Sequence, residues 1–156
     1  MANISKITKK RLGEILIAEG LIHDNQVQEA LAEQQKSGLL LGEALIKLGY
    51  VTELDIAGAL STQMGLPYIN ALSYTGYVEI FKLMPVEFWE KNQMAPLDKI
   101  GDVVTFTVAG SMSENTLEEL EKKIPGEIYF FVSTTSQIKQ VIKNYQSPDQ
   151  EKQMKR

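Results

Sequence analysis

The sequence has 156 residues, of which 44% are hydrophobic and 23% are charged, as is normal for a globular protein. The formal net charge of −4 argues against nucleic-acid binding, which requires a broad basic surface. Cysteine is absent, so disulfides, thiolate nucleophiles and cysteine metal sites are excluded. We expect a cytoplasmic protein without membrane insertion, because neither a signal peptide nor an apolar run of about 18 residues is present.

An internal duplication is the most distinctive feature of the chain. When residues 11–34, the first copy, are aligned without gaps to residues 40–63, the second copy, nine of 24 positions are identical. The identities run from Leu12/Leu41 to Gln34/Gln63, and several other positions are apolar in both copies. Two copies are too few for a solenoid, so the duplication predicts one small unit built from two similar parts.

The first copy has the pattern of two helices. Apolar residues at helical spacing predict a helix over about 10–19, which Gly20 ends because glycine readily adopts a left-handed conformation. Asp24 is expected to be the N-cap of a second helix over about 25–36.

The second copy predicts the same arrangement. Gly49 ends its first helix, and Thr52 with Asp55 resembles a capping box at the start of its second helix. That helix is expected to end near Met64, before Gly65-Leu66-Pro67. Residues 1–70 are therefore predicted to form a four-helix subdomain.

The rest of the chain mixes helices and strands. Residues 78–93 are predicted to be helical in two pieces broken near Pro85. The segments 94–100 and 103–110 are rich in apolar and β-branched residues and predict a hairpin that turns at Gly101-Asp102.

Three further elements follow the hairpin. Ser111 with Glu114 is expected to start a helix that ends near 123, and residues 127–134 predict a third strand. Thr134 with Gln137 is expected to cap a helix that ends near Tyr145.

The predicted fold class is α+β. We expect the duplicated helical subdomain to be followed by a small α/β subdomain with a short sheet, residues 71–146. The polar residues 147–156 are expected to form a disordered tail.

Two repeated glycines are the first indication of a site. Gly13 and Gly42 lie at helix starts, where glycine costs about 1 kcal/mol relative to alanine, which indicates a close approach to the backbone. Helix N-termini favour anions such as phosphate, and Arg11 could cover a phosphate or stack on a base. Gln34 and Gln63 could hydrogen-bond a base edge. The alternative is that the leucines and isoleucines are core residues and the copies serve only as a scaffold.

Both copies resemble the MshEN motif. The resemblance lies in Arg11-Leu12-Gly13, Leu16-Ile17, Gly20-Leu21-Ile22, Leu31 and Gln34, in their counterparts of the second copy, and in the five-residue spacer 35–39. It extends with less specific motifs, such as "LPYINA" and "IKQVIKNY", over about residues 8–146. MshEN domains are N-terminal domains of type II secretion and type IV pilus assembly ATPases and bind cyclic di-GMP.

The resemblance implies a set of ligand-binding residues that hold the two halves of the nucleotide. It implies mostly apolar and backbone contacts, with an arginine for guanine and phosphate. The residues implied are Lys9, Arg11, Leu12, Gly13, Leu16, Gly20, Gln34, Leu41, Gly42, Glu43, Leu45, Gly49 and Gln63. The sequence departs from the family where Leu40 stands in place of the arginine that opens the second motif. The loss of one such contact, about 1.5–3 kcal/mol, would weaken affinity about ten- to a hundredfold.

Three hypotheses for function follow. The first is a non-catalytic cyclic di-GMP sensor that passes its state to an unidentified protein of a secretion, pilus or motility machine. The second is a nucleotide-independent adaptor with the same fold, and the third is an enzyme of unknown type. We expect no catalysis, cofactor or metal, because no P-loop is present, the ATPase of the family is not in this sequence, and His23 is the sole histidine.

Overall fold

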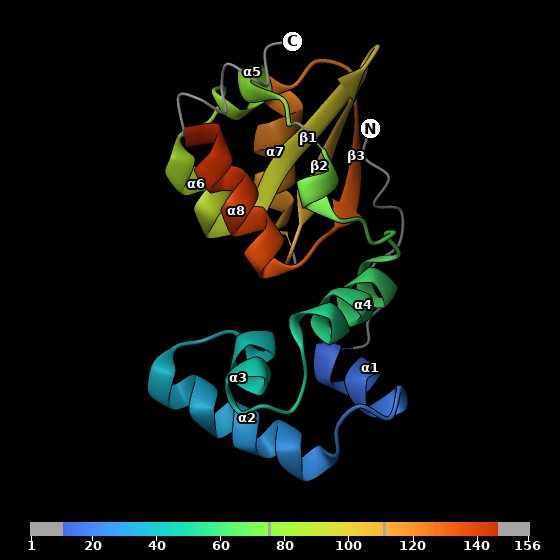
Figure 1. The fold of residues 1–156 in the computed structure, drawn as a ribbon, viewed down its shortest axis with the longest axis vertical. Helices are drawn as coiled ribbons and strands as arrows, with labels where there is room; N and C mark the ends of the chain where they lie inside the picture. Colours follow the sequence, from blue (N-terminus) through green and yellow to red (C-terminus); the bar gives the residue numbers. More distant parts are fainter. Residues whose placement is uncertain (1–10, 75, 111, 147–156) are drawn as a thin grey trace.

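A computed structural model describes residues 11–74, 76–110 and 112–146 (Figure 1). Within these ranges the chain forms helices and one three-stranded sheet, which confirms the predicted α+β class. The elements in chain order are α1 (Leu12–Ala18), α2 (Asp24–Ser37), α3 (Leu41–Lys47), α4 (Glu53–Met64), the 3₁₀ helix η1 (Ala71–Ser73), α5 (Val78–Phe81), α6 (Val86–Asn92), β1 (Met94–Ile100), β2 (Val103–Val108), α7 (Glu114–Lys123), β3 (Glu127–Val132) and α8 (Thr135–Gln146). In the described part of the chain, no helix combines the length and apolarity needed to cross a membrane.

The helices of the two copies pack crosswise. Here α1 and α4 form one neighbouring pair and α2 and α3 form the other, so each helix lies against a helix of the other copy (Figure 1). Within each copy, Gly13 faces Val27 and the equivalent Gly42 faces Ile56. The same contact between the first and second helix therefore repeats in both copies. We refer to α1–α4 as the helical half and to residues 65–146 as the α/β half.

The first helix of each copy ends in the same way, as the glycines predict. Gly20 and Gly49 adopt φ angles of 76° and 81°, in the left-handed region. The N–H of Leu21 donates to the carbonyl of Leu16 at 3.0 Å, and the equivalent bond from Tyr50 to Leu45 is also 3.0 Å. The left-handed glycine thus lets the chain turn back and satisfy carbonyls at the helix end.

The second helices start differently in the two copies. The capping box of Thr52 and Asp55 is confirmed, with reciprocal hydrogen bonds of 2.9 and 3.1 Å. The prediction that Asp24 is an N-cap is wrong, because His23 occupies that position and Asp24 is the first residue of α2. His23 is held there by Gln26, whose side chain accepts from the His23 N–H at 2.8 Å.

Two polar contacts between the copies join α2 to the end of α3. The Lys47 ammonium lies 2.5 Å from the Glu33 carboxylate, and the Tyr50 hydroxyl donates to Glu29. The hydrogen bond from Lys47 lowers the pKa of Glu33, and the hydrogen bond to Glu29 raises the pKa of Tyr50. Both contacts stabilise the α2–α3 pair, although exposed pairs of this kind are weak.

The sheet of the α/β half has the order β1-β2-β3. The predicted hairpin of β1 and β2 is antiparallel, with an irregularity between Pro96 and Asp98, whereas β2 and β3 are parallel and connected through α7. Helices α5, α6 and α8 contact β1 (Figure 1). The Trp89 indole is fully buried and donates to the Phe81 carbonyl at 2.9 Å, as expected of a core residue.

The connection between the halves pairs with the sheet. The N–H of Val132 donates to Pro67, and the Val132 carbonyl accepts from Ile69, at 2.9 and 2.8 Å. The residues after α4, which the predicted boundary at residue 70 assigns to the helical subdomain, therefore extend the β3 edge.

Of the two predicted helix caps in the α/β half, that of α8 is confirmed and that of α7 is wrong. For α8, Thr134 and Gln137 form the expected reciprocal hydrogen bonds at 3.1 and 3.2 Å. For α7, the expected cap Ser111 is wrong, because Ser113 is the N-cap and accepts from the Thr116 N–H at 3.2 Å. Ser111 itself, and the tail predicted for 147–156, lie outside the described residues.

Candidate functional site

A pocket lies where the second copy meets the α/β half. It has a volume of about 190 Å³, and we call it the copy-2 pocket. The helical half lines it with Leu12, Leu40, Leu41, Gly42, Glu43, Ile46, Ile56, Leu60 and Gln63, and the α/β half lines it with Gln93, Ala109, Gly110 and Thr135. The starts of α1 and α3 thus meet at one hollow, whose lining is mainly apolar and includes a few polar side chains.

Five of the residues implied by the resemblance line this pocket, namely Leu12, Leu41, Gly42, Glu43 and Gln63. Seven others lie outside its lining: Arg11, Gly13, Leu16, Gly20, Gln34, Leu45 and Gly49. Lys9 lies outside the described residues. The pocket therefore gathers the second-copy part of the predicted set, together with one residue of the first copy.

Four of the predicted residues that lie outside the pocket have structural positions of two kinds. Leu16 and Leu45 are 0% exposed and belong to the core. Gly20 and Gly49 are exposed at the helix ends described above. Their positions account for the repeated residue types by packing and by backbone conformation, without a ligand.

The repeated glycines at the helix starts also have a packing role. A Cβ atom at Gly13 would lie 3.6 Å from Val27, and one at Gly42 would lie 3.3 Å from Ile56. The close approach that the glycines indicate is thus made by the second helix of the same copy. Val27 and Ile56 were not in the predicted set, although their apolar character in both copies could have indicated them.

The two copies differ in their exposure at equivalent positions. Leu60 is 6% exposed because the α/β half covers it, whereas the equivalent Leu31 is 41% exposed. Arg11 and Leu40 are the N-caps of α1 and α3, and both side chains are exposed. The first copy therefore presents an open apolar face next to an arginine, and the second copy presents a covered apolar pocket next to a leucine.

The α/β half contributes four lining residues that sequence reasoning missed. Gln93 has a φ of 48°, a left-handed conformation that is uncommon for a residue other than glycine. The Gln93 carbonyl accepts from the Ala109 N–H at 2.9 Å, which joins the end of α6 to the segment after β2. No local pattern indicates these residues, because only the packing of the halves brings them to the pocket.

A hydrogen-bonded contact joins the halves beside the pocket. The Glu53 carboxylate, at the start of α4, accepts from the N–H of Ser136 at 2.9 Å and from its hydroxyl at 2.7 and 2.8 Å. A carboxylate at the first turn of α8 is favourable because the helix N-terminus carries partial positive charge. The side chains of this contact fix α4 relative to α8.

Groups suited to a metal ion are not found among residues 11–74, 76–110 and 112–146: no cluster of three or more histidine, aspartate or glutamate side chains could hold one. The pocket instead offers the Glu43 carboxylate, two amide side chains and a hydroxyl group among apolar walls. Such a lining suits a flat organic ligand held by a few directed hydrogen bonds.

The fold and this pocket define a two-part α+β domain with a duplicated helical half. The chain belongs to the MshEN domain family, whose model matches residues 64–152. The match begins at the last residue of α4, so it comes from the α/β half rather than from the duplicated motifs that carried the resemblance.

Two relatives are type IV pilus assembly ATPases named PilB. The protein from Myxococcus xanthus is 32% identical over 135 residues, which cover 86% of this chain and 24% of the relative. The protein from Thermus thermophilus is 28% identical over 121 residues, which cover 76% and 14%. The chain thus spans about a quarter or less of the length of these relatives.

Solved structures share the fold. The structure of MshE with cdg matches with a TM-score of 0.72 and 25% identity, over 88% of this chain and 99% of that chain. The N-terminal domain of XpsE matches with a TM-score of 0.66 and 18% identity, over 87% and 97%. Both matches include most of the helical half, since each covers nearly nine-tenths of the chain.

Proposed function

We propose that this chain is a non-catalytic module that binds cyclic di-GMP and regulates a pilus, secretion or motility machine. The related MshE was solved with cdg, the abbreviation of cyclic di-GMP, and the PilB relatives belong to type IV pilus assembly. Membership of the MshEN family supports the role as a regulatory module. The contacts between the duplicated segments support cyclic di-GMP as its ligand.

One observation carries the proposal: the two motif starts lie together. A Cβ atom at Gly13 would lie 3.7 Å from the Leu41 side chain, and Leu12 lines the same pocket as Leu41 and Gly42. Cyclic di-GMP consists of two identical guanosine halves. A ligand with two-fold symmetry suits a surface on which the start of α1 and the start of α3 repeat the same residues.

The size of the copy-2 pocket limits how such a ligand would lie. Its volume of about 190 Å³ is below the range of about 300–1,000 Å³ that is usual for small-molecule sites. One half of the ligand would enter this pocket, and the rest would extend over neighbouring surface. The open face of the first copy, with Arg11, Leu31 and Gln34, provides one such surface.

The position of the pocket suggests how binding would be transmitted. Because residues from both halves line it, a ligand in the pocket would favour one arrangement of the halves over others. Binding would then act by population shift, and the partner, a protein of the machine, would recognise the favoured arrangement.

Calorimetry with purified protein tests the proposal. We expect saturable binding of cyclic di-GMP at or below about tens of micromolar, and a thermal shift with this ligand but not with cyclic di-AMP, GTP or ATP. Arg11→Ala should weaken binding about tenfold or more because a charged contact is lost, whereas Lys36→Ala on exposed α2 should not. An absence of binding, or equal binding by parent and Arg11→Ala, would contradict the proposal.

A nucleotide-independent adaptor is the second candidate. It is favoured by Leu40, which is 55% exposed where the family motif has an arginine, and by the packing role of Gly13 and Gly42. In this case the α/β half alone would contact the partner. A pull-down of a pilus or secretion component with equal yield in the presence and absence of cyclic di-GMP would support the adaptor.

A further inference from the structure

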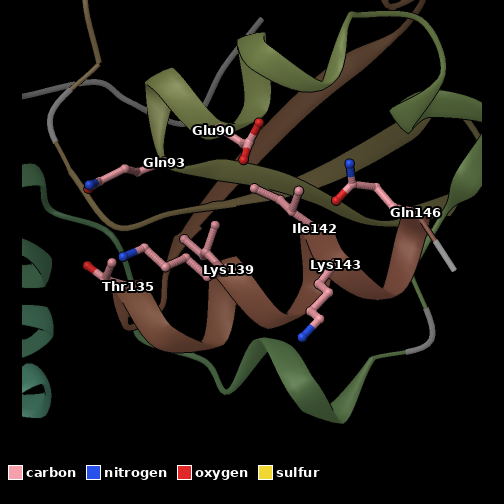
Figure 2. Close-up of a pocket in the computed structure, with 8 residues that line it drawn as sticks. Glu90, Gln93, Thr135, Lys139, Ile142, Lys143 and Gln146 are labelled. Carbon is pink, nitrogen blue, oxygen red and sulfur yellow. The ribbon is translucent and has the colours of Figure 1, made fainter.

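A second pocket adjoins the copy-2 pocket. It lies between α6 and α8, has a volume of about 360 Å³, and is called the α6–α8 pocket here (Figure 2). Gln93 and Thr135 line both pockets. The two hollows therefore meet at these residues, on the edge of the α/β half that faces the second copy.

The α6–α8 pocket has an apolar floor and charged walls. Ile138 and Ile142 form the floor and are 1% and 4% exposed, so they are held in place by the core. Lys139 and Lys143 come from α8, and Glu90 comes from α6. In the described part of the chain, neither lysine forms an ion pair with a carboxylate.

The two lysines point in different directions. Figure 2 shows the Lys139 ammonium extending toward Thr135 and the end of the pocket where Gln93 lies. Lys143, one helical turn further on, points away from Glu90 and Gln93, while Glu90 points toward Ile142 (Figure 2). One unpaired cation is thus directed at the junction of the two pockets, and the carboxylate lies away from that junction.

The charge of this lysine complements a deficit in the second copy. Leu40 provides no positive charge beside the copy-2 pocket, where Glu43 is the charged lining side chain and is negative. The pocket is also too small for more than part of a dinucleotide. We propose that the ligand site continues from the copy-2 pocket into the α6–α8 pocket and that Lys139 contacts a phosphate of the bound cyclic dinucleotide. This inference rests on the proposed function, and it adds a subsite in the α/β half and a residue that determines affinity.

The chemistry at the junction suits a phosphodiester. An ammonium attracts the phosphate oxygens and donates charge-assisted hydrogen bonds to them, while the Gln93 amide and the Thr135 hydroxyl can donate neutral ones. The buried isoleucines provide an apolar surface for the adjoining ribose or base. Glu90 disfavours an anion deeper in the pocket, which places the phosphate at the Lys139 end.

Calorimetric titration of four variants with cyclic di-GMP tests the inference. We expect Lys139→Gln to weaken binding about tenfold, because a charged hydrogen bond is lost, and Lys139→Arg to restore it to within about threefold. The matched control Lys122→Gln makes the same charge change on α7, at an exposed residue outside both pockets, and should bind within about twofold of the parent. Glu90→Gln should bind as well as the parent or more tightly, since a nearby negative charge is removed.

The outcomes separate the inference from the proposed function. If the parent binds and Lys139→Gln binds equally well, the α6–α8 subsite is wrong and the proposed function stands. If Lys122→Gln loses as much affinity as Lys139→Gln, the effect is general attraction by positive charge and the subsite is again wrong. If the parent does not bind cyclic di-GMP, the proposed function and the subsite both fail. These side chains are exposed, and equal thermal melting of the variants verifies that each one is folded.

Discussion

The two copies of the duplicated segment share a backbone plan but have different surroundings. Both start with a glycine packed on the second helix, and both end their first helix in a left-handed glycine. The α/β half covers the apolar face of the second copy and leaves that of the first copy open. The comparison shows that residues at equivalent positions differ in role, because the second copy packs against the α/β half and the first copy faces solvent.

The largest expected difference between the copies concerns Leu60 and Leu31. Leu60→Ala should lower the free energy of unfolding by about 2–5 kcal/mol, because a buried side chain leaves a cavity against the α/β half. Leu31→Ala should cost less than about 1 kcal/mol, because Leu31 is 41% exposed. Urea unfolding of both variants measures the difference. Equal losses would mean that the first copy is also covered.

The missing arginine provides the next test. Leu40→Arg gives α3 the N-cap residue that α1 has in Arg11, at a position that is 55% exposed. We expect it to tighten cyclic di-GMP binding about ten- to a hundredfold, because a charged hydrogen bond contributes about 1.5–3 kcal/mol. Leu40→Gln serves as the uncharged control in the same calorimetric titration. No gain with arginine would indicate that the second copy does not face the ligand's phosphates.

The contact between the halves should have a smaller effect on stability. Glu53→Gln weakens the hydrogen bonds to Ser136 and should lower the free energy of unfolding by about 1–2 kcal/mol. Its equivalent in the first copy, Asp24, is exposed at the start of α2. Asp24→Asn should therefore lower the free energy of unfolding by only a few tenths of the loss at Glu53. Thermal unfolding at pH 7 compares the two variants. A matching loss would assign the effect of Glu53 to its own helix α4.

The smallest expected difference concerns the glycines at the helix starts. Gly13→Ala places its Cβ in ordinary contact with Val27 at 3.6 Å, and it should stabilise the protein by up to about 1 kcal/mol through helix propensity. Gly42→Ala brings its Cβ to 3.3 Å from Ile56, so the gain should be cancelled or reversed. Chemical denaturation resolves this sign difference. A larger gain at Gly42 would show that Ile56 moves aside without cost.

Local chemistry explains why most of the fold could be predicted. Capping pairs such as Thr52 with Asp55 act within one helical turn, so they can be recognised from the sequence. The two wrong caps are errors of one or two residues in segments with several candidates. At α2, the reach of Gln26 back to His23 defines the helix start, and at α7 two serines compete within three positions.

The candidate site was predicted less completely because it depends on long-range packing. The motif indicated residues of both copies, but it could not show that Leu16 and Leu45 are core residues. Nor could it show that Gln93 and Thr135, far along the chain, complete the copy-2 pocket. These contacts depend on the docking of the two halves, for which no local spacing provides a signal.

The crosswise pairing of α1 with α4 and of α2 with α3 has a consequence for the history of the chain. A polypeptide that carried a single copy would lack the partner helix for each of its own helices. It could bury those surfaces by associating with a second, identical molecule in a symmetric homodimer. Fusion of two such subunits into one polypeptide would retain the dimer's paired geometry while allowing each subunit to diverge, as Arg11 and Leu40 have done.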